Sequence, residues 1–220
     1  MVREYSLREK KSARTKIAIM NAFMERLKDK RYEDISIREV CLDAEVAEGT
    51  FFNYFPEKID ILSYYLYLMT SKMIWKAGAK ASASGYLALV ESLFKQLSEE
   101  WSNSNLAYQI LSVLIAQSKR PKKILFSGFE KKLVFPDCPG IEETPSVILD
   151  EWLRVCVIQA RKSGELSPKI NVDDVVVSLI TIITGTLLAL RFENVNKCGY
   201  HYRRQLHDLW RVLGAEEKGR

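Results

Sequence analysis

Apolar residues recur along most of this chain at spacings of three and four positions, which is the repeat of an α-helix that buries one face. The first such run contains Ile19, Met20, Phe23 and Leu27, with charged residues around them. The same repeat predicts further helices over residues 59–76, 86–100, 106–118, 146–162 and 200–213. We therefore expect an all-α protein. A small-residue break at 78–85 and a short helix plus a loop at 126–144 interrupt the longer helices.

Residues 175–190 are apolar nearly all round, and Val, Ile and Thr dominate them, so periodicity alone also allows a buried strand. The length of the run favours a helix, with Asn171 or Asp173 as its N-cap. The helix expected at 146–162 is apolar on two sides, which requires two neighbours, and Gly164 is placed to end it.

Spare apolar faces on these two neighbouring helices predict that two copies of the chain pair through a two-fold symmetric interface. Small side chains would form one narrow face on the second helix and let another helix approach closely. The residues assigned to this interface are Trp152, Cys156, Ser178, Thr181, Gly185 and Ala189.

A different pattern near the N-terminus predicts two short helices joined by a tight turn. Ser36, followed three residues later by Glu39, predicts a capping box, and Ile35 and Val40 are spaced to pack together as a hydrophobic staple. The apolar stripe breaks at Glu45 and resumes after it. This is the pattern of a helix-turn-helix, whose second helix presents exposed side chains to a DNA major groove.

The segment from about Ile19 to Leu62 resembles the DNA-binding domain of the TetR/AcrR family of bacterial transcriptional repressors. The motif that carries the resemblance consists of Gly49-Thr50, Phe51-Phe52, Tyr54-Phe55 and Lys58. The resemblance implies a three-helix, helix-turn-helix DNA-binding domain at residues 1–56 and a helical effector-binding and dimerisation domain at residues 57–220. It also implies a homodimer joined by the last two long helices of each copy as a four-helix bundle.

The chain departs from the family pattern at four positions. Glu45 stands where the family usually has a Gly that accepts a positive φ, and Ala47 stands where a Ser usually caps the recognition helix. Arg31 replaces a Gly that commonly closes the first helix, and Phe52 replaces a Tyr, which removes one hydroxyl that could reach a phosphate.

The net charge of +5 and the pI of about 8.9 are mild for a DNA-binding protein, but the charge is unevenly distributed. Six Lys and Arg residues against two Glu lie within the first 16 residues, and we expect the polar arm to about Ala13 to be mobile.

The four cysteines are far apart and form no C-x-x-C motif, so thiols are expected rather than a zinc site or disulfides, and no cofactor is implied. No N-terminal leader is apparent, and the longest uncharged run of 16 residues is shorter than the roughly 20 needed to span a bilayer. We therefore expect a cytoplasmic protein.

Double-stranded DNA with an inverted-repeat operator is the partner that this reasoning predicts. We expect Thr50 and Asn53 to contact base edges, Asn53 because its amide can pair bidentately with adenine. Phe52 is expected to contact a thymine methyl group. Arg38 corresponds to a position that touches DNA in the family, and could read guanine or hold a phosphate. Phosphate contacts are assigned to Tyr54, Lys58, Lys11 and Arg14.

The C-terminal two-thirds is helical and rich in aromatic residues, so a pocket between helices could bind a small apolar or amphipathic effector that releases the repressor from DNA. The candidate lining residues are Tyr65, Met69, Met73, Phe94, Tyr108, Phe126 and Trp152. Packing alone also explains each of them.

Two other classes of function are alternatives to a DNA-binding regulator. An enzyme is disfavoured, because His201 and His207 are six positions apart and do not share a helical face, and no nucleophile motif or phosphate loop accompanies them. The second alternative is a helical effector-binding or interaction protein that has lost specific DNA binding. The departures at Glu45, Ala47 and Phe52 keep this alternative open.

Overall fold

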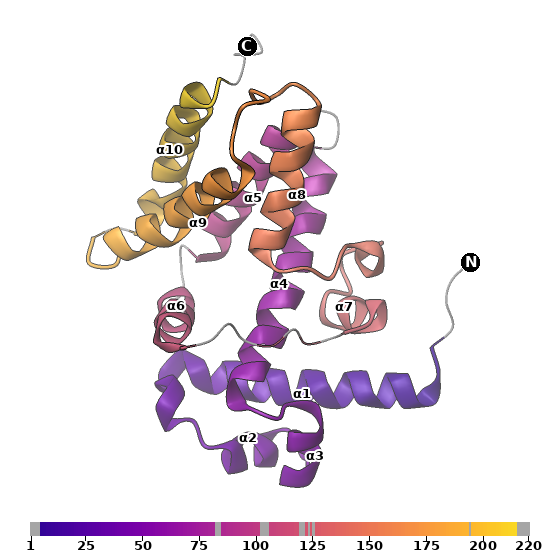
Figure 1. Cartoon of the computed structure of the whole chain (residues 1–220). Coiled ribbons are helices and arrows are strands. Elements are labelled where there is room, and N and C mark those ends of the chain that lie inside the picture. Colours follow the sequence, from indigo (N-terminus) through magenta and orange to yellow (C-terminus); the bar gives the residue numbers. More distant parts are fainter. Residues whose placement is uncertain are drawn as a thin grey trace. The chain divides into compact units, whose positions relative to one another are not determined.

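The computed structural model describes residues 5–81, 85–101, 106–118, 122, 124, 126–193 and 195–214. Within these ranges the chain forms ten α-helices, three short 3-10 helices and no strand, so the predicted all-α class is confirmed (Figure 1). The elements are α1 (Leu7–Asp29), η1 (Tyr32–Asp34), α2 (Ile37–Asp43), α3 (Glu48–Tyr54), α4 (Lys58–Ala81), α5 (Tyr86–Trp101), α6 (Leu106–Ala116), α7 (Gly128–Val134), η2 (Ile141–Glu143), α8 (Leu149–Lys162), α9 (Val172–Ala189), η3 (Val195–Lys197) and α10 (Cys198–Val212).

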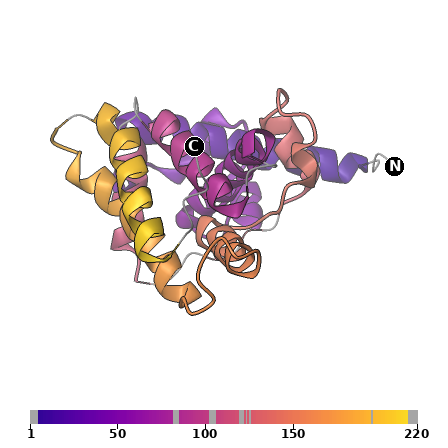
Figure 2. The ribbon, with the colours of Figure 1, turned by 90° about the horizontal axis from the view of Figure 1, so that it is seen from above.

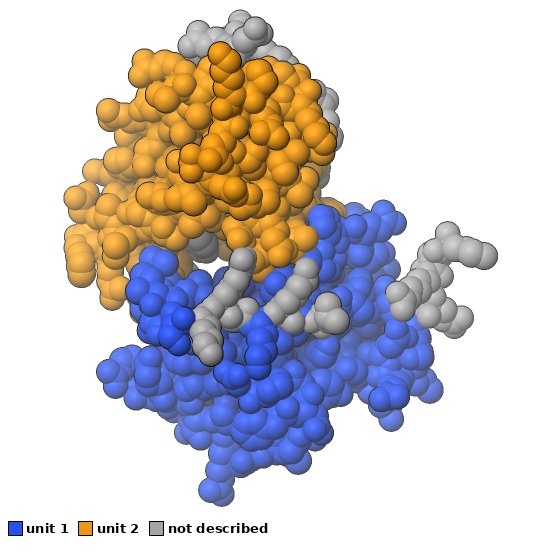
Figure 3. All heavy atoms as spheres, viewed as in Figure 1, with its two compact units in different colours: residues 1–72, 109–146 blue, residues 73–108, 147–220 orange. Residues whose placement is uncertain are grey.

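The chain divides into two compact units (Figure 3). Unit 1 consists of Met1–Lys72 and Gln109–Ser146, and unit 2 of Met73–Tyr108 and Val147–Arg220. Helix α4 is continuous from one unit into the other, and the boundary expected after residue 56 lies inside unit 1. The assignment of DNA binding to residues 1–56 and of effector binding to residues 57–220 stays a prediction.

The first helix begins earlier than the sequence analysis predicted. The Ser6 hydroxyl accepts a hydrogen bond from the Glu9 amide at 3.2 Å, and the Glu9 carboxylate accepts one from the Ser6 amide at 2.8 Å. This capping box starts α1 at Leu7, so a mobile arm up to Ala13 is wrong for the described residues. Ala13 is itself buried, which adds packing to the local signal.

A buried carboxylate joins three helices of unit 1. Glu130, at 4% exposure, accepts hydrogen bonds from the Tyr64 hydroxyl of α4 at 2.8 Å and from the Lys16 ammonium of α1 at 3.2 Å. Its second oxygen accepts from the amide and the hydroxyl of Ser127, which completes a capping box at the start of α7. Burial beside this carboxylate raises the pKa of Tyr64, so the phenol stays protonated and donates to Glu130.

The neighbouring Lys131 is buried as well. Its ammonium donates to the Thr144 carbonyl oxygen and lies 5.5 Å from the centre of the Phe126 ring. Burial lowers the pKa of Lys131. Two charged residues therefore attach α7 to the rest of unit 1. Glu130 binds α1 and α4, and Lys131 binds the segment that follows η2.

Unit 2 is a bundle in which α5 packs against α8 and α10, and α9 packs against the same two helices (Figures 1 and 2). The ambiguous apolar run forms a helix, and the Asn171 side chain caps it by accepting from the Asp173 amide at 2.9 Å. The Tyr202 hydroxyl of α10 donates to the Ile183 carbonyl oxygen of α9 at 3.0 Å. Gly164 closes α8 with φ +79°, as predicted.

The N-terminus of α5 is capped by a residue from a distant part of the chain. The two carboxylate oxygens of Glu165 accept from the backbone amides of Tyr86 and Leu87, each at 3.0 Å. Gly85 makes room for this contact: it has φ +94°, and a Cβ there would lie 2.5 Å from a Glu165 oxygen.

Replacing Glu130 by Gln should lower the free energy of unfolding by about 3 kcal/mol, because a largely buried ammonium then loses its counter-charge. Urea unfolding monitored by circular dichroism measures the change. Glu142→Gln is the matched control, since the partly exposed Glu142 forms an ion pair with the exposed Lys132 at 3.8 Å, and its loss should cost less than about 1 kcal/mol. Equal losses in both variants would contradict a special role for Glu130.

Candidate nucleic-acid interface

Residues 35–55 form the predicted helix-turn-helix, made of α2 and α3. Ile35 and Val40 are 3% and 0% exposed, as a hydrophobic staple requires. Phe51 and Phe55 are both fully buried with ring centres 6.2 Å apart, so two of the four clustered aromatics belong to the core of unit 1. The remaining side chains of α3 are free to face outward.

The turn between the two helices depends on a non-glycine residue in the left-handed region. Glu45 has φ +54°, its amide donates to the Leu42 carbonyl oxygen, and the Val46 amide donates to the Cys41 carbonyl oxygen. This pair of hydrogen bonds is a Schellman motif, whose left-handed position usually holds Gly. Ala47 then begins α3 without a side-chain cap, so both consequences expected from the departures at Glu45 and Ala47 are present.

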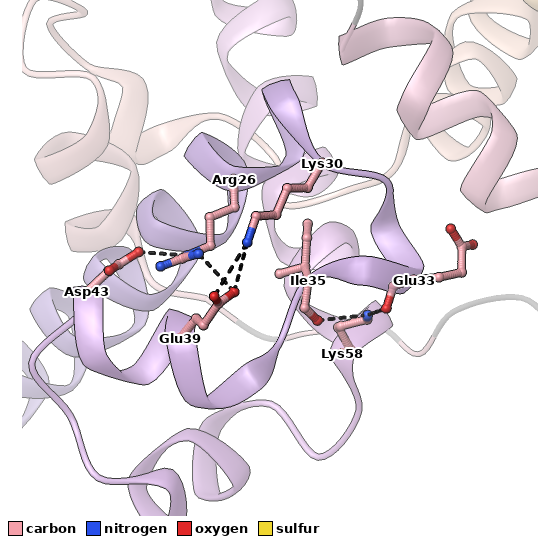
Figure 4. A network of polar contacts seen from close by, with 7 residues as sticks. All are labelled: Arg26, Lys30, Glu33, Ile35, Glu39, Asp43 and Lys58. Atoms are coloured by element: carbon pink, nitrogen blue, oxygen red, sulfur yellow. Dashed lines mark hydrogen bonds and ion pairs between the residues drawn. The ribbon is translucent and has the colours of Figure 1, made fainter.

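The capping box predicted for Ser36 and Glu39 is wrong, because no side-chain cap is formed at Ser36. The Glu39 carboxylate instead accepts from Arg26 at 2.9 Å and from Lys30 at 3.1 Å (Figure 4). Two cationic partners, one in α1 and one at its C-cap, attract a carboxylate more strongly than one backbone amide. These contacts lower the pKa of Glu39, with the hydrogen bond from Lys30 as the largest cause.

A second ion pair completes the attachment of α2 to α1. Arg26 also donates to the Asp43 carboxylate at 2.7 Å, so one guanidinium bridges both ends of α2 (Figure 4). The helix-turn-helix is therefore fixed to α1 by charge as well as by its apolar core. Arg31 needs no positive φ, since α1 ends at Lys30 in an extended conformation.

The structure brings the predicted base-contacting residues together on the outer surface of the motif. Phe52 is 49% exposed, Asn53 is exposed and Thr50 is partly exposed on α3, while Arg38 is exposed on α2. Tyr54 is partly buried. Hydrogen-bonding groups and one aromatic ring are thus available on a single short helix, which is the chemistry required to read base edges.

Sequence reasoning missed Leu42. This side chain is 77% exposed and lies one helical turn after Arg38 on α2. An exposed Leu beside polar groups is suited to apolar contact with a sugar or a thymine methyl. Its spacing of four from Arg38 was the available signal.

Lys11 and Arg14, both assigned to phosphates, lie on α1 instead of on a mobile arm. Both are exposed, and their spacing of three places them on one face of the helix. A rigid helix therefore presents these two charges.

The structure gives Lys58 a role that sequence reasoning did not foresee. Its ammonium donates to the Ile35 carbonyl oxygen at 3.1 Å (Figure 4). It also donates to the Tyr32 carbonyl oxygen at 2.5 Å and lies 4.4 Å from the centre of the Tyr32 ring. Burial lowers the pKa of Lys58 and raises that of Tyr32 to about 12. Lys58 thus holds the segment between α1 and α2, and its assignment to a phosphate stays a prediction.

The seven residues predicted to line an effector pocket are divided between the two units. Tyr65, Met69 and Phe126 belong to unit 1, and Met73, Phe94, Tyr108 and Trp152 to unit 2. Phe94 is 1% exposed and stacks edge-on against Tyr202 at 5.2 Å, which is a packing contact. In the part of the chain that the structure describes, no three His, Cys, Asp or Glu side chains gather as metal ligands would.

The small-residue face predicted for dimerisation lies on the surface of α9. Thr181, Gly185 and Ala189 are exposed, and Val177 and Leu188 on the same side are 64% and 56% exposed. Ser178 is partly exposed. This is an uncharged strip on a helix whose opposite side is buried in unit 2.

The two interface residues predicted on α8 are placed differently. Trp152 and Cys156 are 8% and 3% exposed, because this side of α8 packs inside unit 2, and burial raises the pKa of the Cys156 thiol to about 12. The outer side of α8 carries Val155, which is 53% exposed, and Arg154, which pairs with Asp173 of α9.

Among the described helices, α9 alone is long and apolar enough to cross a bilayer, with a third of its residues buried in the fold. Core and interface helices of proteins that are not in membranes meet the same criterion, so this helix alone does not indicate a membrane protein.

Replacing Glu45 by Gly should raise the free energy of unfolding by about 1 kcal/mol, because Gly adopts a positive φ without steric cost. Thermal unfolding measures the change. Glu25→Gly is the control, since Glu25 is an exposed residue inside α1 and should lose about 1 kcal/mol. A destabilised Glu45→Gly variant would show that the Glu45 side chain contributes more than its backbone strain costs.

Comparisons with known proteins concern the fold. No family model and no curated protein matches the sequence. Among solved structures, FadR from Thermus thermophilus, a TetR-family transcriptional repressor in complex with lauroyl-CoA, has a TM-score of 0.62 at 17% identity, covering 93% of this chain and 98% of that chain. TylP, a TetR regulator from Streptomyces fradiae, has a TM-score of 0.60 at 14% identity, covering 96% and 83%. RolR in complex with resorcinol has a TM-score of 0.59 at 13% identity, covering 94% and 91%. The chain therefore has the fold of TetR-family regulators, which confirms the fold that the sequence resemblance implied.

Proposed function

We propose that this protein is a DNA-binding transcriptional regulator of the TetR type, a repressor that binds an inverted-repeat operator as a homodimer and is released by a small-molecule effector. The observation that carries the proposal is the exposed surface of α3 on a fixed helix-turn-helix. Thr50, Phe52 and Asn53 project from a helix whose other side is locked into the core by Phe51 and Phe55. A helix held in this way can enter a major groove without losing its own packing.

The residues at the centre of this surface would recognise the bases. Asn53 is suited to a bidentate contact with adenine, Thr50 to a single hydrogen bond, and Phe52 to a thymine methyl. Arg38 on α2 would read guanine or hold a phosphate at the edge of the contact. Lys11 and Arg14 on α1, with Tyr54, would hold the phosphate backbone and set the register.

A two-fold dimer supplies the spacing that an inverted repeat requires. The uncharged strip of α9, together with Val155 of α8, offers an apolar face that a second copy can cover. Such a dimer would present two α3 helices to adjacent major grooves, which are about 34 to 36 Å apart on one side of the duplex.

An effector would act through the continuous helix α4. This helix begins with Lys58, directly after the helix-turn-helix, and its last turns belong to unit 2. Structures of the same fold hold ligands as different as lauroyl-CoA and resorcinol, so the fold accommodates a range of apolar and amphipathic molecules. A ligand releases DNA only if it binds better to the state that does not fit the operator. The protein would act in the cytoplasm, where its operator lies.

Selection from random duplexes tests the DNA-binding proposal and also delivers the operator. The enriched sequences should form an inverted repeat. Enrichment of no sequence would instead favour a helical effector-binding protein without specific DNA binding, a reading that the exposed Glu48 at the start of α3 supports by placing negative charge near the phosphates.

Asn53→Ala should cost about 1 to 3 kcal/mol of binding and remove the preference at one position of each half-site. Lys11→Ala should weaken binding equally for all sequences and reduce its dependence on salt. Gel shifts on operator variants at several salt concentrations measure both effects. Lys95→Ala, an exposed lysine in unit 2, is the control and should leave binding unchanged. Exchanged behaviour of the first two variants would overturn the assignment.

Thr181→Glu should convert the dimer to a monomer, because it places two carboxylates in an uncharged interface. Light scattering after size-exclusion chromatography measures the mass. Arg203→Glu on the exposed side of α10 changes charge without entering the strip and should keep the dimer. A Thr181→Glu variant that remains dimeric would exclude the α9 strip as the interface.

A further inference from the structure

Gln96 on α5 is a buried polar residue that the proposed machinery does not use. The residue is 3% exposed, and its side-chain nitrogen Nε2 has no contact with solvent. Across the described residues, no acceptor lies within hydrogen-bond distance of this nitrogen. Buried amide groups without a partner are rare in folded proteins, and each requires an explanation.

The direction of the side chain follows from helical spacing. Phe94 stacks on Tyr202 of α10, and the Ser98 hydroxyl lies 2.9 Å from where a Cβ would stand at Gly199 of α10. Gln96 is two residues from each, a rotation of about 200° in either direction, so it points away from α10. Figure 1 shows α5 between α8 and α10.

The opposite face of α5 turns toward the end of α4 and toward α8. Glu100, four residues after Gln96 and on the same ridge, pairs with Lys76 of α4 at 3.9 Å. The adjacent turns of α4 bury Met73 and Ala77, and α8 buries Trp152 on the side that packs within the unit. The buried residues of α4 and α8 nearest this face of α5 are therefore apolar or aromatic.

One other buried polar atom described in unit 2, the Tyr108 hydroxyl, also has no hydrogen-bond partner. Tyr108 lies beside Cys198 of α10 and beside Arg191, which is 5.4 Å from the centre of its ring, and Gln96 points away from α10. The two other buried polar residues described in unit 2 have partners: the Ser98 hydroxyl donates to the Lys95 carbonyl oxygen, and Thr186 accepts from Gln205 at 2.8 Å. A trapped water usually needs two to four polar partners, and this region offers one. A charged ligand would need a buried counter-charge, and none of the buried side chains described in this unit is ionic.

We propose that Gln96 is the polar recognition group of a ligand site inside unit 2, and that it donates a hydrogen bond to one oxygen of a neutral, otherwise apolar molecule. Ketones, esters and lactones have this chemistry, because each joins one acceptor carbonyl to a hydrocarbon body. The inference rests on the proposed function for its regulatory meaning, since it names the class of effector that would release the DNA. Binding itself depends only on unit 2.

A matched pair of probes isolates the hydrogen bond. 2-Acetylnaphthalene and 2-ethylnaphthalene have the same ring system and nearly the same size, and only the first carries a carbonyl oxygen. Titration of the full-length protein, followed by tryptophan fluorescence, should show the ketone binding about five- to tenfold more tightly than the hydrocarbon. In Gln96→Leu the two affinities should agree within about twofold. Equal affinities in the unmodified protein, binding of neither probe, or a preference that survives in the variant would each overturn the proposal.

The stability of the unliganded variant supplies a second measurement. Gln96→Leu should unfold at the same temperature as the unmodified protein or higher, because an amide without a partner is replaced by an apolar group of similar size. Gln205→Leu is the matched control and should unfold at a lower temperature, since the Gln205 amide donates to Thr186. Loss of stability in Gln96→Leu would show that the amide serves the fold or a bound water, and would overturn the proposal.

The DNA selection distinguishes failure of the proposed DNA-binding function from failure of the proposed ligand site. A protein that enriches an inverted repeat but does not distinguish the two naphthalenes retains the proposed function and loses this inference. A protein that enriches no sequence but prefers the ketone through Gln96 retains the ligand site and loses the regulatory function.

Discussion

The arrangement of unit 1 depends on one buried carboxylate. Glu130 comes from a part of the chain more than sixty residues after Tyr64, yet it accepts hydrogen bonds from α1 and α4 and caps its own helix. An unpaired charge at this depth would be costly, so the three helices are stable only in the arrangement that supplies all of its donors. Helix α1 in turn holds α2 through Arg26. The position of the recognition helix therefore follows from an interaction outside the helix-turn-helix itself.

The local features of this fold are mostly predictable, because they depend on residues close together in sequence. Helical periodicity predicted the helices, Asn171 predicted the start of α9, and Gly164 predicted the end of α8. The absence of Gly at position 45 correctly indicated a strained turn. The missed start of α1 was also local, since Ser6 and Glu9 carry the same capping signature that was recognised further along the chain.

Contacts between distant segments explain what could not be predicted. The signature at Ser36 and Glu39 fails because Arg26 of α1 and Lys30, directly after α1, bind the glutamate. The convergence of the Tyr32 and Ile35 carbonyl oxygens on the Lys58 ammonium could not be predicted either, because these residues lie more than twenty positions before Lys58. Trp152 and Cys156 lie on one stripe of α8, but periodicity does not tell which apolar stripe faces a neighbour within the same chain and which one would face a second copy. In the candidate site, Thr50, Phe52 and Asn53 are at least partly exposed, as expected. Phe51 and Phe55 occupy the buried side of this segment, so the other side chains must face outward.

The contact between Gly85 and Glu165 has a consequence for how related chains can diverge. The carboxylate occupies the space that any side chain at position 85 would need, and it satisfies two amides that would otherwise lack an acceptor. If Glu165 is replaced, its carboxylate no longer excludes a side chain at position 85, and if Gly85 is replaced, that carboxylate can no longer reach the two amides. Descendants of a common ancestor should therefore keep this glycine and this glutamate together or lose them together, and an alignment of relatives would record the two as a covarying pair although 80 positions separate them.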